Sequence, residues 1–105
     1  MKSKVHNCLF SSLYELRAKK YLEIAGIEVL IRNSELQIEQ MKKATTFAQD
    51  HKWSGYANDI VRYSQITKDH SSNLEHLRPK LPSLKEELAD IDEAILEMKR
   101  CPAIA

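Results

Sequence analysis

The 105-residue sequence contains few residues that make turns, with only two glycines and three prolines. An average chain of this length has about seven glycines and about five prolines. Because few tight turns can be built from this supply, a sheet of many strands is excluded and a small number of long helices is favoured. The length corresponds to one domain, and we expect residues 1–105 to form a single helical domain.

Cysteine and long apolar runs are also scarce. Cys8 and Cys101 have no C-x-x-C spacing, and two cysteines cannot form the dense disulfide set of small secreted domains. The N-terminal apolar stretch Val5–Phe10 is interrupted by polar residues and is too short for a signal peptide. No run approaches the roughly 18 apolar residues of a membrane span. These absences predict a cytoplasmic protein with reduced cysteines and no membrane span.

A regular apolar pattern runs on both sides of one short break. Its positions step by three and four residues, which keeps one face of a helix toward one partner. Before the break they are Ile24, Ile27, Ile31, Ser34, Ile38, Met41, Thr45 and Ala48, and after it Trp53, Tyr56, Ile60, Tyr63, Thr67, His70, Leu74, Leu77 and Leu81. The break at Gln49–Lys52 predicts a hairpin of two antiparallel helices, each roughly 37 Å long at a rise of 1.5 Å per residue.

The pattern predicts helical segments at residues 4–22, 24–49, 53–78 and 84–100. The first two can form one helix, because Gly26 costs about 1 kcal/mol relative to alanine without necessarily breaking a helix. Asn33–Ser34 is a second candidate break, and we favour one helix that bends near Gly26. We therefore expect an all-α fold, an antiparallel bundle of three to four helices with coiled-coil-like packing.

Two signals separate the last two segments. Pro79 disfavours helical geometry in the residue before it, which should end the third segment at Arg78. Ser83 followed by Glu86 has capping-box spacing and should start the fourth segment. The apolar face of that fourth segment consists of Leu84, Leu88, Ile91, Ile95 and Met98.

Charge is unevenly distributed along the chain. Residues 1–22 carry five basic and one acidic side chains, whereas residues 83–105 carry three basic and six acidic ones. We interpret this asymmetry first as attraction between two helices, or between two copies of the chain. A basic N-terminal helix that binds nucleic acid is the alternative. That cluster consists of Lys2, Lys4, Arg17, Lys19 and Lys20.

No catalytic, cofactor or metal motif is present. His6, His51, His70 and His76 contain no H-E-x-x-H pair, no serine lies in a G-x-S-x-G turn, and two isolated glycines make no phosphate-binding loop. We expect neither an enzyme nor a cofactor. Thr67 and His70 interrupt the apolar face, where polar residues can fix helix register, reach solvent or contact a ligand.

Some apolar residues lie off the main face, and aromatic residues gather after the break. Leu22, Val29, Leu30 and Leu36 give the second segment a wider apolar surface, which usually meets two neighbours or a second chain. Trp53, Tyr56 and Tyr63 have helical spacing. Aromatic residues so spaced most often form core, although tryptophan and tyrosine also favour protein interfaces.

This region resembles the helical hairpin of FliT-type flagellar export chaperones. The resemblance rests on the stretch Phe47–Trp53, on Tyr63 ten residues after the tryptophan, and on the stretch Leu77–Leu81. It covers roughly residues 35–100. It implies a non-catalytic chaperone of type III secretion that holds a helical end of an export substrate in an apolar groove. The last helix, Ser83–Arg100, would cover that groove.

The expected function is therefore helix-in-groove recognition of a protein partner. The expected partner-binding residues are Trp53, Tyr56, Ile60, Tyr63, Leu74 and Leu77. A homodimer is compatible with the same surfaces. The alternatives are a structural subunit of a larger coiled-coil assembly, and a small regulator that binds nucleic acid or inhibits an enzyme through its basic N-terminal helix.

Overall fold

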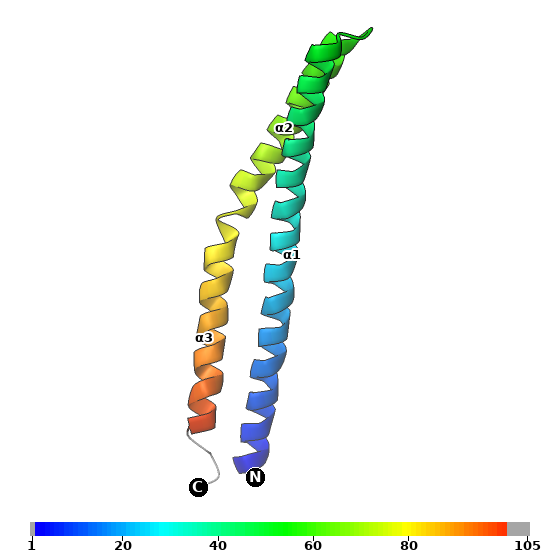
Figure 1. Ribbon diagram of the computed structural model, residues 1–105. Helices are drawn as coiled ribbons and strands as arrows, with labels where there is room; N and C mark the ends of the chain where they lie inside the picture. The colour runs from blue at the N-terminus through cyan, green and yellow to red at the C-terminus, as the bar shows by residue number, and fades with distance from the viewer. Residues whose placement is uncertain (1, 101–105) are drawn as a thin grey trace. The chain divides into compact units, whose positions relative to one another are not determined.

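A computed structural model describes residues 2–100 of the chain, with side chains from residue 10 onward. Its three helices are α1 (Lys2–His51), α2 (Tyr56–Leu77) and α3 (Lys80–Arg100) (Figure 1). The described residues contain no strand, which confirms the all-α prediction. Cys101 and the side chain of Cys8 lie outside this description, as do the side chains of Lys2 and Lys4.

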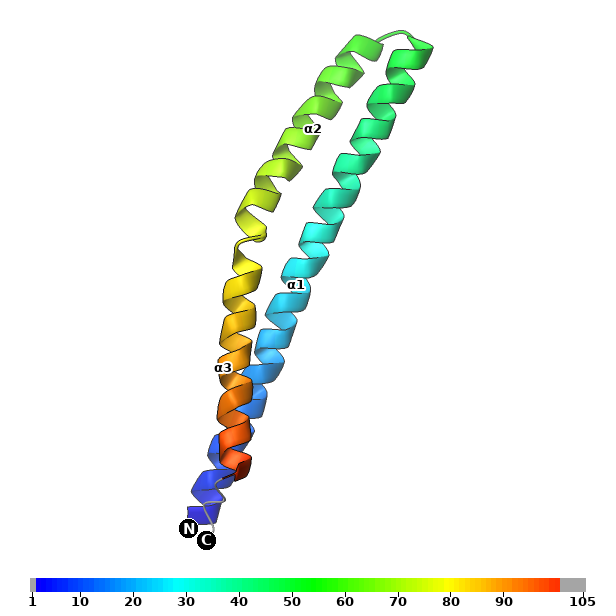
Figure 2. The same cartoon turned by 60° about the vertical axis from the view of Figure 1, so that its left-hand side comes forward.

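The chain divides into two compact units. One combines the described residues up to Gly26 with those from Lys80 onward, and the other consists of Ile27–Pro79. The first unit therefore pairs the beginning of α1 with α3, and the second pairs the rest of α1 with α2. In each unit the two helical segments lie side by side, as two views show (Figures 1 and 2).

Each unit holds two helical segments and not the three to four helices of the predicted bundle. The cause lies in α1, which is helical through both Gly26 and Asn33–Ser34 and so makes no turn before His51. The segments predicted at 4–22 and 24–49 are one element in the structure, which agrees with the favoured prediction of a single helix through Gly26. Without a turn between them, the first cannot fold back as a separate layer on the second.

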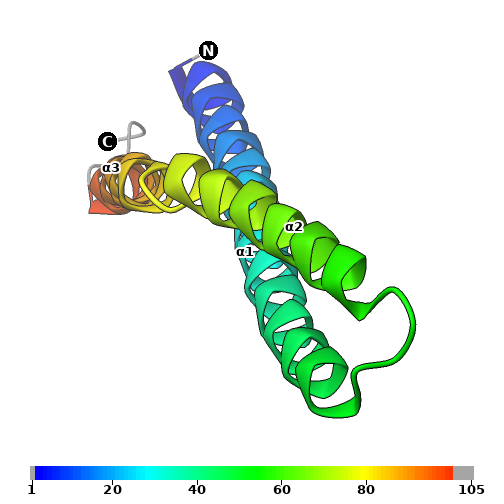
Figure 3. The ribbon, with the colours of Figure 1, turned by 90° about the horizontal axis from the view of Figure 1, so that it is seen from above.

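The loop after α1 connects α1 to α2 and so forms the turn of the hairpin in the second unit (Figure 3). Lys52 has a φ of 50°, in the left-handed region, and its N–H donates to the Ala48 carbonyl oxygen at 2.9 Å. A turn follows, in which the Tyr56 N–H donates to the Trp53 carbonyl oxygen at 3.0 Å. Trp53 therefore lies in the loop, and α2 begins three residues later than predicted.

The start of α3 also differs from the prediction. The helix begins at Lys80, so Ser83 lies inside it and does not cap it. Pro82 is in the first turn, where its missing N–H removes no intrahelical hydrogen bond. Arg78 keeps helical dihedrals (φ −56°, ψ −43°) although it precedes a proline. Pro79 thus ends α2 through its missing donor and not through an extended Arg78.

Few side chains are deeply buried among the described residues. Ile24 and Ile95 are the buried apolar residues of the first unit, and Leu74 is that of the second. Ser34 is the one buried polar residue in the described part of the chain. Most other positions of the apolar face, such as Ile38 and Ile60, are only partly buried. Two packed segments shield a narrow strip and leave the flanks of each apolar face accessible.

Gly26 and Gly55 give opposite expectations for substitution by alanine. A Cβ at either position would meet no atom within 4 Å, but Gly55 has a φ of +81° whereas Gly26 is inside a helix. We expect Gly26→Ala to raise the free energy of unfolding by about 1 kcal/mol through helix propensity. Gly55→Ala should lower it by about 1 kcal/mol, because a left-handed backbone disfavours L residues. Urea unfolding followed by circular dichroism measures both, and a gain at Gly55 would contradict this account.

Candidate functional site

The loop end of the second unit contains an aromatic hollow with a volume of about 260 Å³. The end of α1, the loop and the first turns of α2 all contribute to its wall. The lining residues are Ala44, Phe47, Ala48, His51, Trp53, Tyr56, Asp59 and Tyr63. We use the name aromatic hollow for this set of residues.

Three rings of the aromatic hollow pack on one another. Phe47 and His51 are stacked, with ring centroids 3.9 Å apart and an interplanar angle of 21°. Trp53 meets both edge-to-face, with centroids 5.7 Å from Phe47 and 5.5 Å from His51. The His51 Nδ1–H donates to the Phe47 carbonyl oxygen at 2.9 Å, which fixes the imidazole over the phenyl ring. Trp53 nevertheless remains 65% exposed.

Local sequence spacing explains how these rings meet. Phe47 and His51 are four residues apart in the last turns of α1, so they lie on one side of the helix. The left-handed Lys52 ends the helix directly after His51 and sends the chain into the turn that presents Trp53. Tyr56 and Tyr63 are seven residues apart in α2, so they share a face. Both are partly buried.

The structure distributes the six predicted partner-binding residues along the hairpin. Trp53, Tyr56 and Tyr63 line the aromatic hollow. Leu77 lines a second hollow, of about 260 Å³, together with Leu30, Ser34, Asn73 and His76. Leu74 is a buried core residue, only 6% exposed, and Ile60 is partly buried. The six therefore share the second unit, but they form no single pocket.

Sequence reasoning missed two residues of the aromatic hollow as site residues, Phe47 and His51. Phe47 is off the main apolar face of α1 and is 51% exposed. His51 matches no metal motif, and the sequence pattern predicts no role for it beyond its place in the stretch Phe47–Trp53. The available signal was their four-residue spacing, because side chains four residues apart are neighbours wherever a helix continues through both. The predicted break at Gln49–Lys52 placed His51 outside the helix, whereas α1 continues to His51.

The polar positions on the apolar face are satisfied within the second unit. Nδ1 of His70 lies 3.4 Å from Oγ of the buried Ser34, which links α2 to α1. The Thr67 hydroxyl donates to the Tyr63 carbonyl oxygen at 2.9 Å, and Thr45 does the same to Met41 at 2.8 Å. Only the contact between His70 and Ser34 links the two helices and can fix their register. The two threonine bonds stay within one helix.

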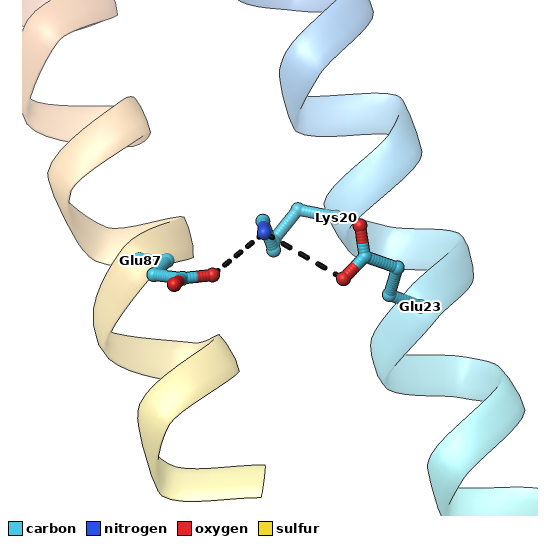
Figure 4. Close-up of polar contacts among 3 residues, drawn as sticks. All are labelled: Lys20, Glu23 and Glu87. Carbon is cyan, nitrogen blue, oxygen red and sulfur yellow. Dashed lines mark hydrogen bonds and ion pairs between the residues drawn. The ribbon is translucent and has the colours of Figure 1, made fainter. Parts of the chain in front are cut away.

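The basic N-terminal cluster is partly paired with α3 inside the first unit. Lys20 Nζ lies 2.6 Å from Glu87 Oε2 and 3.6 Å from Glu23 Oε2 (Figure 4). Arg17 Nη1 lies 3.4 Å from Asp92 Oδ1. From Arg17 to Lys20 the chain advances along α1, whereas their partners run backward along α3 from Asp92 to Glu87. This order is that of antiparallel segments. Two of the predicted nucleic-acid-binding cations thus contact carboxylates of the acidic C-terminal segment.

The hydrogen bond with Glu87 raises the pKa of Lys20 above its ordinary value of 10.5. Because the pKa of Lys20 is raised in the folded state, its contact with Glu87 stabilises the fold. This contribution is fully present below pH 10.5 and is lost as the pH rises through the raised pKa.

We expect Glu87→Gln to lower the pKa of Lys20, measured from the NMR shift of its ε-methylene group. Glu86→Gln is the control, and an equal fall in that variant would contradict the assignment.

Within residues 2–100, no group of three histidine, cysteine, aspartate or glutamate side chains is arranged to hold a metal ion, among those side chains that are described. None of the helices in this described range has the length and apolar character needed to cross a membrane.

The site is thus a hollow lined mainly by aromatic and apolar side chains. Compared with protein-family models, with curated proteins and with solved structures, the chain matches none of them.

Proposed function

We propose that this chain is a non-catalytic binding protein that holds an amphipathic helix of a protein partner along the apolar face of its hairpin. One observation carries the proposal: the apolar face of the second unit is left incompletely covered. Leu74 is the only apolar residue buried among the described residues of that unit. The remaining apolar-face residues are partly buried: Ile27, Ile31, Ile38, Met41, Ile60, Tyr63 and Leu77.

A third helix would complete the packing that two segments leave unfinished. With the partner helix bound, α1, α2 and that helix would form a three-helix bundle with coiled-coil-like packing. Each 100 Å² of apolar surface removed from water contributes about 2.5 kcal/mol before the entropic costs of association. The alternating three- and four-residue steps of both helices suit a partner with the same spacing.

The resemblance to FliT-type chaperones gives this partner its proposed identity. We propose a cytoplasmic chaperone of type III or flagellar secretion, whose partner is a helical segment of an export substrate. In that family the last helix covers the groove. Here α3 belongs to the first unit, where Arg17 and Lys20 contact its carboxylates. The groove proposed in the second unit is formed by α1 and α2 alone.

Site-specific photocrosslinking in the native host tests the proposal. A photoreactive residue at Ile60 on the apolar face is compared with one at Lys43, which is exposed. We expect crosslinks from position 60 to one helical segment of a secreted protein, and few from position 43. Equal crosslinking from both positions, or none from position 60, would contradict the proposal.

A second candidate, a subunit of a coiled-coil assembly, is favoured by exposed apolar residues of α1. Within the second unit, Val29 and Leu36 are seven residues apart and are 53% and 48% exposed. Seven-residue spacing is that of a coiled-coil seam. Light scattering separates the candidates: a monomer or dimer that is unchanged by Val29→Gln favours the chaperone, whereas a larger species that the substitution dissociates favours the assembly subunit.

A further inference from the structure

The aromatic hollow differs chemically from the rest of the apolar face. Five of its eight lining residues carry aromatic rings, counting the imidazole of His51, and two more are alanines. Asp59 is the remaining lining residue, so the wall carries one carboxylate and no lysine or arginine. The carboxylate also suits the positive N-terminal end of α2, and it gives the hollow a net negative wall.

The rings form walls at an angle and not one flat stack. Trp53 stands at 87° to Phe47 and at 76° to His51, while Tyr56 and Tyr63 contribute from α2. Aromatic rings carry negative charge on their faces, and a ring face that borders the hollow attracts a cation placed over it. Asp59 lies in the first turn of α2 and adds a formal negative charge.

The volume favours a side-chain end over a larger ligand. About 260 Å³ is below the range of roughly 300–1,000 Å³ that drug-sized ligands occupy. An anion would be repelled by Asp59, and a neutral apolar group would gain nothing from it. An alkylammonium group uses both the ring faces and the carboxylate.

We propose that the aromatic hollow binds an alkylammonium group, supplied by a lysine side chain of the helical partner. The proposal that a lysine of the partner supplies the ammonium group rests on the proposed function, whereas the proposal that the hollow prefers a cation does not. In the complex, the partner helix lies along the apolar face and its lysine reaches the loop end of the hairpin. There Phe47, Trp53 and Tyr63 surround the ammonium group, and Asp59 neutralises it.

Trp53 is the only tryptophan in the chain, so its fluorescence reports on this hollow directly. The probes are choline, its neutral isostere 3,3-dimethylbutan-1-ol, and Nα-acetyl-lysine methylamide, each added at constant ionic strength. We expect choline and the lysine amide to produce a saturable change, and the neutral isostere to bind at least about tenfold more weakly. Equal binding of choline and its isostere, or no saturable change with choline, overturns the cation site.

A matched pair of variants locates the charge that matters. Asp59→Asn removes the carboxylate of the hollow, and Asp50→Asn removes an exposed one nearby that does not line it. We expect the first to weaken choline binding about three- to tenfold and the second to leave it unchanged. If both substitutions weakened choline binding equally, the cation would be attracted only by the net charge of the surface, and the proposed site would be overturned. Because both side chains are exposed, both variants should keep the helical circular dichroism of the original chain.

The outcomes separate this inference from the proposed function. Choline binding without binding of the lysine amide would overturn lysine as the source. Crosslinking of a helical segment from position 60, combined with no response to any cation, would overturn the cation site and leave helix recognition standing. Binding of both cations without any crosslinked helix would support the cation site and overturn the chaperone.

Discussion

Replacing Ile95 by alanine is expected to lower the free energy of unfolding by about 3 kcal/mol. Ile95 is the most buried apolar side chain among the described residues, at 3% exposure. Removing three carbon atoms loses their transfer free energy and leaves a cavity that two packed helical segments can only partly close. For a domain of this size, such a loss corresponds to a decrease of about 10–20 °C in the melting temperature.

The adjacent residue provides a matched control for Ile95. Leu96 is 46% exposed, so Leu96→Ala removes an equal number of carbon atoms from a side chain that water already reaches. We expect it to cost less than about 1 kcal/mol. Urea unfolding followed by circular dichroism measures both variants. Equal losses would mean that α3 is not packed through the Ile95 face.

Much of the fold follows from spacing that the sequence displays. The three- and four-residue steps predicted long helices, a break at Gln49–Lys52 and an apolar face on the last helix that includes Ile95. The first helix continues two residues further than predicted, to His51. The unequal charge of the chain ends predicted attraction between helices, as the contact of Lys20 with Glu87 now shows. The helices, the break and the apolar face depend on the spacing of residues a few positions apart, and the attraction depends on net charge. Spacing and net charge are both visible in the sequence itself.

The differences lie where a local rule was overridden. Ser83 and Glu86 have capping spacing, but α3 begins earlier, because a proline in the first turn costs a helix no hydrogen bond. Arg78 retains helical dihedrals before Pro79, against the usual preference. Both rules are statistical, and a helix that can lengthen by several residues gains hydrogen bonds that outweigh them.

The aromatic hollow could be predicted only in part. Trp53, Tyr56 and Tyr63 were identified from helical spacing, although Trp53 was assigned to a helix and lies in the loop. Phe47 and His51 become part of the hollow because Lys52 adopts a left-handed backbone, which turns the chain back and places Trp53 against them. Nothing in the residue type predicts this conformation, since lysine rarely adopts it. Contacts across a loop depend on such single dihedral angles.

Leu74→Ala is the corresponding test in the second unit, with an expected loss of about 2.5 kcal/mol. Leu74 is 6% exposed and lies one turn after His70, whose ring reaches the buried Ser34. Because the remaining apolar-face residues are only partly buried, they cannot compensate for the missing isobutyl group. Hydrogen exchange should show faster exchange of the α2 amides, from Tyr56 to Leu77, than in the original chain.

Val61→Ala is the control for Leu74, because Val61 lies in the same helix and is 70% exposed. It should change the free energy of unfolding by less than about 0.5 kcal/mol. If Leu74→Ala proved equally mild, the hairpin would not depend on its one buried apolar side chain. If the cost is as large as expected, Leu74 is the core that holds α2 on α1, and the accessible residues beside it remain available to a partner helix. The proposed function needs that separation between a buried residue that maintains the hairpin and partly buried neighbours that bind.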